Sequence, residues 1–120
     1  MSKLKIAANP FFWTTAAFHS PSESGEMQEV KVRVKLAYKN DTDYQDLLYK
    51  QGPQQEPGTS DKFVATQVLI GWGDDICDAS DKPLPYNDAN RDALFNEHKP
   101  IATAIVKAWI AGQMGAAPGN

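Results

Sequence analysis

Ser60–Tyr86, SDKFVATQVLIGWGDDICDASDKPLPY, decides the fold, because here a strongly apolar segment, a tryptophan between two glycines and a proline-rich turn follow one another. Ser60 is a good helix N-cap, and the apolar residues from Phe63 onward recur at approximately the spacing of a helix face. We therefore predict a buried helix that starts at Ser60 and ends at Gly71-Trp72-Gly73, where a glycine takes the left-handed conformation. Trp72 is expected to lie buried just beyond the helix end.

The acidic segment Asp74–Lys82 follows, and within it Asp78–Lys82 has the composition of a turn between two short extended pieces at Ile76-Cys77 and Leu84–Tyr86. Its four aspartates also suggest a calcium loop, since hard cations prefer several carboxylates in one loop. The spacing does not fit, because position 6 counted from Asp74 is Ala79 instead of glycine and position 12 is Pro85 instead of glutamate. A solvated turn without a metal is the favoured interpretation.

The order of these motifs resembles the small tail assembly chaperones of phages and prophages. Gly71-Trp72 is followed by an acidic turn, by PLPY at Pro83–Tyr86, by the short helical segment NDANRDALF and by the apolar segment PIATAIVKAWIAG at Pro100–Gly112. The similarity covers Phe63–Trp109 and extends more loosely over Val30–Lys50. One departure is the sequence Ser-Asp-Lys at positions 80 to 82, where the family usually has a glycine.

The resemblance implies a binding role without catalysis. Such chaperones cover apolar helices of the long tape measure protein and bring it to the tail tube subunits. The implied partners are therefore the tape measure protein and the tail tube protein, and no cofactor is implied. A second copy of the chain is a further candidate partner, for the apolar face of the last helix. A minor structural protein of the tail is the alternative function.

Length and composition agree with one ordinary globular domain spanning residues 1–120. The chain is 42% hydrophobic and 22% charged, with a net charge of -3 and a pI near 5.2. This acidic balance does not favour nucleic acid or an anionic membrane as partner. The start of the chain lacks an apolar core of signal-peptide length, so we expect a location in the bacterial cytoplasm.

The organisation of the chain follows from composition. Residues 1–50 are β-rich with one short helix, 51–59 (QGPQQEPGT) form a connector, 60–112 are helical, and 113–120 form a flexible tail.

Strands are expected at Phe11–His19 and Val30–Tyr38, paired as an antiparallel hairpin, with a shorter strand or arm at Leu4–Ala8. Strict alternation in the second strand places five apolar residues on one face: Val30, Val32, Val34, Leu36 and Tyr38. The other face carries Lys31, Arg33 and Lys35, a basic stripe that either contacts phosphate or is a solvated sheet face, and nearby glutamates favour the latter.

Three further helices are predicted. Thr42 and Gln45 form a capping box, Asn87 caps a second helix, and Pro100 suits the first position of a third. Together with the helix from Ser60 these give an α+β fold, in which a small N-terminal antiparallel sheet packs with about four short helices, three of them C-terminal.

The last helix carries a wide apolar stripe that is either core or a surface for a partner helix. Its residues are Ile101, Ile105 and Trp109 at four-residue spacing, with Ile110 to one side. Spacing alone favours core, whereas the family resemblance raises the interface interpretation. These four residues are the predicted protein-binding site.

No catalytic or metal-binding motif stands out elsewhere in the sequence. His19 and His98 are isolated, and the single cysteine, Cys77, lies next to aspartates that disfavour a thiolate. The sequence also lacks a glycine-rich phosphate loop and a nucleophile elbow. We therefore expect no enzyme activity.

Overall fold

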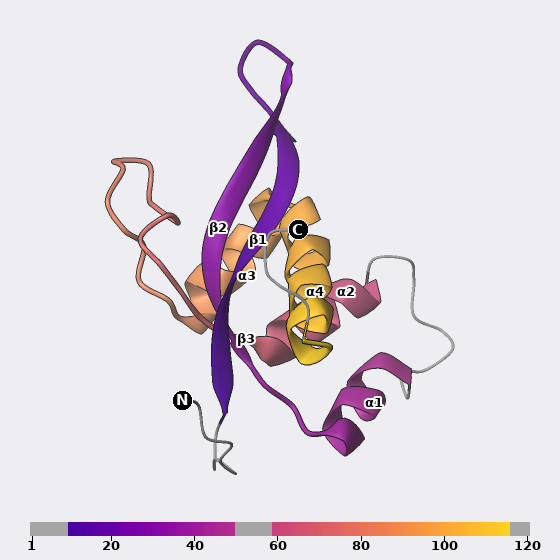
Figure 1. Ribbon diagram of the computed structural model, residues 1–120. Helices are drawn as coiled ribbons and strands as arrows, with labels where there is room; N and C mark the ends of the chain where they lie inside the picture. The colour runs from indigo at the N-terminus through magenta and orange to yellow at the C-terminus, as the bar shows by residue number, and fades with distance from the viewer. Residues whose placement is uncertain (1–9, 50–58, 116–120) are drawn as a thin grey trace, which may run out of the picture.

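A computed structural model describes residues 10–49 and 59–115 of the chain. The elements follow the order β1 (Phe11–Pro21), β2 (Met27–Ala37), α1 (Asp41–Tyr49), α2 (Thr59–Val68), β3 (Leu69–Trp72), α3 (Asp88–Glu97) and α4 (Pro100–Gln113) (Figure 1). The α+β class is confirmed, as are four helices, three of them after the connector. The predicted strand at Leu4–Ala8 and all but the last residue of the 51–59 connector lie outside the described residues.

β1 and β2 form the predicted hairpin, whose tip extends beyond the helices (Figure 1). The register runs without interruption from Phe11 opposite Ala37 to Pro21 opposite Met27. Alternation is confirmed for the buried residues of β2, which are Val32, Val34 and Leu36. Tyr38 corrects the prediction: it lies past the end of β2 and is 44% exposed, because the chain leaves the sheet there on its way to α1.

The prediction of a helix from Ser60 to Gly71 is wrong at both ends. Helix α2 begins at Thr59 and ends at Val68, after which the chain continues as β3, the third strand of an antiparallel sheet with order β1-β2-β3. β3 pairs with β2 through Lys35 opposite Gly71, and Ile70 is the extra residue of a bulge. Pairing with β2 supplies the backbone partners that further helical turns would otherwise supply, so the apolar run changes from helix to strand.

Gly71 is not a left-handed helix end, because among the described glycines only Gly25 and Gly115 have a positive φ. Its small size serves strand packing instead. A Cβ atom at this position would stand 3.4 Å from the Cβ of Lys35 on the neighbouring strand. The Lys35 stem therefore lies directly over the Gly71 backbone.

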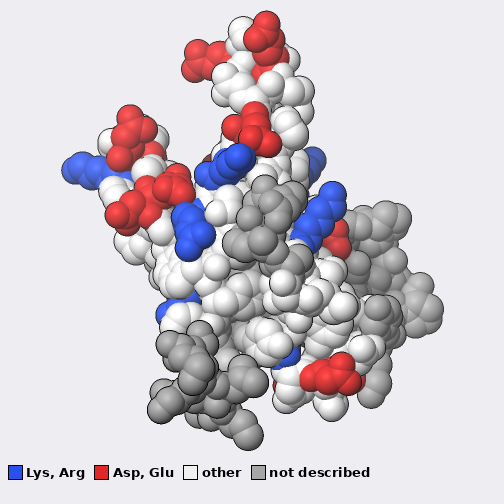
Figure 2. Space-filling model, in the orientation of Figure 1, with Lys and Arg blue, Asp and Glu red and all other residues white. Residues whose placement is uncertain are grey.

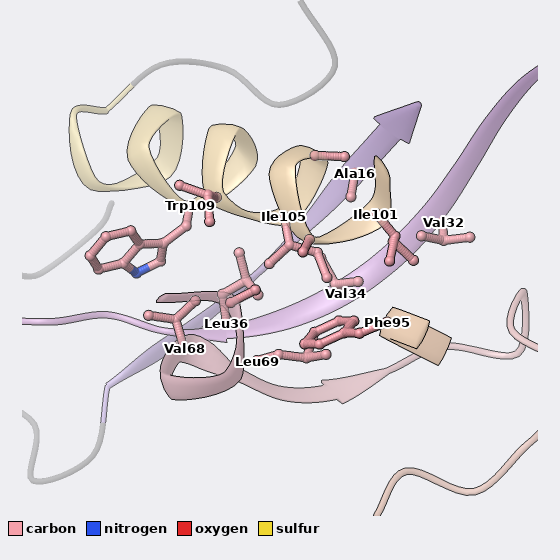
Figure 3. Packing of buried hydrophobic residues seen from close by; sticks show 14 of the residues in the cluster. Ala16, Val32, Val34, Leu36, Val68, Leu69, Phe95, Ile101, Ile105 and Trp109 are labelled. Carbon is pink, nitrogen blue, oxygen red and sulfur yellow. The ribbon is translucent and has the colours of Figure 1, made fainter. Parts of the chain in front are cut away.

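The core forms where α4 packs on one face of the sheet (Figure 3). Residues from α2, β3 and α3 complete it, with Val68, Leu69 and Phe95 below the α4 side chains in Figure 3. The largest fully buried side chains are Trp109, Leu36, Leu69, Ile101, Ile105, Val34, Val64 and Val68. Because the described helices cover only this face, no described helix lies on the other face of β1 and β2.

Of the other three predicted helix starts, two are confirmed and one is shifted. Asn87 caps α3, with its Oδ1 accepting from the Asn90 amide at 2.8 Å, and Pro100 is the first residue of α4. For α1 the cap is Asn40 instead of Thr42, because the Asn40 Oδ1 accepts from the Asp43 amide at 2.8 Å.

Gln113, predicted to be part of a flexible tail, is the last residue of α4. Its side-chain amide accepts from the Lys39 backbone N–H at 2.7 Å and donates to the Lys39 carbonyl at 3.0 Å. This two-way bond fastens the end of α4 to the segment after β2. Residues 116–120 of the predicted tail lie outside the described residues.

Gly112→Ala should destabilise the protein by about 1 to 3 kcal/mol, although alanine is the better helix former by about 1 kcal/mol. The added Cβ would stand 2.2 Å from Cε2 and 2.5 Å from Cζ of the Phe12 ring, so the ring has to move out of its place between α4 and the sheet. Urea unfolding checks the sign. Phe12→Leu combined with Gly112→Ala should recover most of the loss, and a single Gly112→Ala variant more stable than wild type would contradict this packing.

Candidate protein-binding site

Three of the four predicted binding residues on α4 lie inside the core. Ile101 is 1% exposed, and Ile105 and Trp109 are fully buried, so a partner could not contact them without opening the fold. Ile110 is half-buried and packs against the edge of the core. The structure thus leaves only Ile110 of this set near the surface.

Trp109 joins three elements. Its Nε1 donates to the carbonyl oxygen of Ala37, the last residue of β2, at 2.9 Å. Its ring centroid lies 5.1 Å from that of Tyr44 on α1. A buried tryptophan with its N–H satisfied is a packing anchor.

Trp72 is buried at the end of β3, which confirms its predicted burial. Its Nε1 donates to the Leu84 carbonyl at 2.7 Å, and its ring meets Tyr86 edge to face at 4.9 Å between centroids. The Tyr86 hydroxyl in turn donates to the Leu69 carbonyl at 2.6 Å. The PLPY segment is therefore held against β3 by two hydrogen bonds and one aromatic contact.

The open face of the sheet carries exposed aromatic side chains. Phe11 is 51% and Trp13 42% exposed, and both belong to the odd-numbered residues of β1, which point away from the core. Lys35, opposite Trp13 on β2, places its Nζ 4.1 Å from the centre of the Phe11 ring. We call Phe11, Trp13 and Lys35 the outer-face cluster.

Sequence reasoning assigned the strand that contains Phe11 and Trp13 but missed their exposure. β1 reads FFWTTAAFH, with apolar residues at both odd and even positions, so the pattern does not distinguish the core face. The strict alternation of β2 was the available signal, since the register places Trp13 opposite a lysine of the polar face.

The rest of the basic stripe is engaged with its neighbours. Lys31 lies 3.5 Å from Glu29, and the Arg33 guanidinium donates to the Thr15 hydroxyl at 3.4 Å. In Figure 2 the positive side chains are scattered singly among acidic ones, which gather at the hairpin tip and on the loop between β3 and α3. This distribution favours a solvated face over a phosphate-binding surface.

Carboxylates of the acidic turn accept hydrogen bonds from backbone amides. Asp78 accepts from the amides of Ser80 and Lys82, at 2.8 and 3.1 Å, and Asp75 accepts from the Arg33 backbone N–H at 3.1 Å. Asp81 has a φ of 62°, the left-handed conformation that glycine favours, at the place where the sequence departs from the resembled family. Within residues 10–49 and 59–115, no group of three His, Cys, Asp or Glu side chains could hold a metal ion.

The remaining candidate residues are separate from one another. His19 and Cys77 are exposed, and the Cys77 thiol donates to the Asp74 carbonyl at 3.1 Å. His98 lies beside Phe18, with 6.4 Å between ring centroids. The structure does not bring His19, Cys77 and His98 into contact with one another.

Arg91, on α3, is the described titratable residue with a clear pKa shift. Partial burial on its own would lower its pKa, but hydrogen bonds to Tyr86 and Asp92 raise it. Its guanidinium also lies 3.2 Å from Asp88. Arg91 therefore remains charged, and the side-chain amide of Asn90 ties α3 to the PLPY segment by donating to the Pro85 carbonyl at 2.8 Å.

Comparison with protein-family models, curated proteins and solved structures found no match to this chain. None of the described helices is long and apolar enough to cross a bilayer.

Proposed function

We propose that this protein is a non-catalytic binding protein that covers apolar helical segments of a client, acting as a phage tail assembly chaperone for the tape measure protein. The observation that carries the binding role is the exposure of Phe11 and Trp13 side by side with Lys35 on a sheet face that no described helix covers. The client and the biological setting rest on the resemblance of Phe63–Trp109 to tail assembly chaperones.

The outer-face cluster suits such a client for two reasons. Large aromatic side chains supply much contact area while ordering few rotatable bonds, which is why tryptophan anchors many interfaces. The cluster itself presents two aromatic rings, whose contacts do not select for particular polar groups, so it can accept different apolar segments along one long client. The Lys35 ammonium adds attraction for acidic groups that flank those segments.

Trp13→Glu should abolish the ability to keep co-expressed tape measure protein soluble, while leaving the chaperone folded. A charge placed at the centre of the cluster removes a central aromatic anchor, a loss of about 2 kcal/mol or more, equivalent to at least about thirtyfold in affinity. The measurement is the fraction of client recovered in the soluble lysate, with the tape measure protein taken from the phage or prophage that carries the gene.

Two matched variants decide where the client binds. His19→Glu puts the same charge on the same face of β1, away from the cluster, and should have little effect. Ile110→Glu tests the predicted site on α4. If a folded Ile110→Glu variant loses client solubility while Trp13→Glu retains it, the binding surface lies on α4 instead of the sheet. Detection of the chain in purified virions by mass spectrometry would instead support the tail structural protein.

A further inference from the structure

About half of the backbone N–H and C=O groups of β1 have no hydrogen-bond partner in the described structure. The Tyr38 amide donates to the Pro10 carbonyl at 2.9 Å, which fixes the even-numbered residues of β1 as the ones bonded to β2. In an antiparallel ladder the alternate residues then point their N–H and C=O groups the other way. These are Phe11, Trp13, Thr15, Ala17 and His19, and within residues 10–49 and 59–115 their backbone groups have no hydrogen-bond partner.

This edge lacks the features by which proteins usually keep edge strands from pairing. Phe11–His19 contains no charged residue and no proline, and its register with β2 shows no bulge. At the opposite edge of the hairpin, by contrast, backbone groups of β2 do have partners. β3 pairs with Val34–Leu36, and Asp75 occupies the next free amide of β2, that of Arg33.

There is also room beside the edge. A hollow of about 360 Å³ lies between Ala17–His19 of β1 and the side chains of Pro100, Thr103 and Lys107 on α4. Helix α4 packs on the buried face of β1 and leaves this side of the strand accessible. As far as the described residues go, an added strand would therefore meet backbone groups and not a covering helix.

We propose that β1 pairs antiparallel with β1 of a second copy of the chain, about a twofold axis, to join two three-stranded sheets into one continuous sheet. A second copy is the fitting occupant because an antiparallel edge is complementary to itself under twofold symmetry. The strand is uncharged, so self-pairing sets no like charges opposite one another. This inference concerns the edge of β1 and is independent of the client proposed for its open face.

Sedimentation velocity of the purified full-length chain tests the pairing. The wild type should sediment at twice the monomer mass of 13.2 kDa. Ala17→Pro removes one outward N–H from each copy without touching the bonds to β2, a substitution that edge strands tolerate. It should raise the dimer dissociation constant about tenfold or more. Ala17→Val keeps the N–H, adds similar bulk and should remain dimeric.

Hydrogen exchange gives a second readout that needs no substitution. The amides of Trp13, Thr15 and Ala17 should exchange more slowly as the protein concentration rises, whereas unpaired amides would not respond. A wild type that stays monomeric up to about 1 mM overturns the proposal, and so does a dimer in which these amides exchange rapidly. Should Ala17→Pro fail to fold, Ala17→Lys replaces it: a folded monomer supports the pairing and a dimer contradicts it.

Discussion

Trp109→Ala should cost about 3 to 5 kcal/mol of unfolding free energy, one of the two largest losses that we predict for a single truncation. The indole is fully buried among α4, β2 and α1, so its removal leaves a cavity that three elements would have to close. The Ala37 carbonyl would also lose its donor, which adds a desolvation cost of about 1 to 3 kcal/mol where water cannot replace it. A small domain with a total stability of about 5 to 15 kcal/mol would be close to unfolding.

The measurement is urea unfolding monitored by circular dichroism. The two tryptophans that remain in the variant give fluorescence as a second probe. Trp109→Phe is the matched control, because it keeps a ring against Tyr44 and loses only the bond to Ala37 and part of the volume. It should lose clearly less stability than the alanine variant. An unchanged midpoint for Trp109→Ala would show that the core is not organised around this side chain.

Trp72→Ala is the second large effect, at about 3 to 5 kcal/mol. The indole is 9% exposed, donates to the Leu84 carbonyl and packs on Tyr86, so its loss removes both burial and the attachment of the PLPY segment to β3. The melting midpoint should fall, and the amides between Asp74 and Tyr86 should exchange faster than the rest of the protein.

Tyr86→Phe separates the contribution of the Tyr86 hydrogen bond from that of the buried Trp72 indole. It keeps the edge-to-face ring contact and removes the hydroxyl that donates to the Leu69 carbonyl, so a loss of about 1 kcal/mol is expected. Equal losses for Tyr86→Phe and Trp72→Ala would mean that the hydrogen bond, and not the buried indole, holds this loop.

Much of the fold could be predicted where one local signal stood alone. The alternation in β2, the cap at Asn87 and the proline at the start of α4 each act over a few residues, and each appears as predicted. The burial of Ile101, Ile105 and Trp109 follows from helical spacing in the same way, although spacing could not say whether that stripe was core or interface. The proposed client-binding and pairing surfaces remain predictions.

The sequence by itself determined the α+β class, the hairpin and the starts of α3 and α4, because these depend on periodicity, capping and turn chemistry between near neighbours. Only the tertiary structure decided that Leu69–Trp72 is a strand, since its backbone partners lie on β2, more than thirty residues earlier in the chain. It alone decided that Phe11 and Trp13 face outward, because β1 has apolar residues at both odd and even positions and its core face is set only when α4 covers one side.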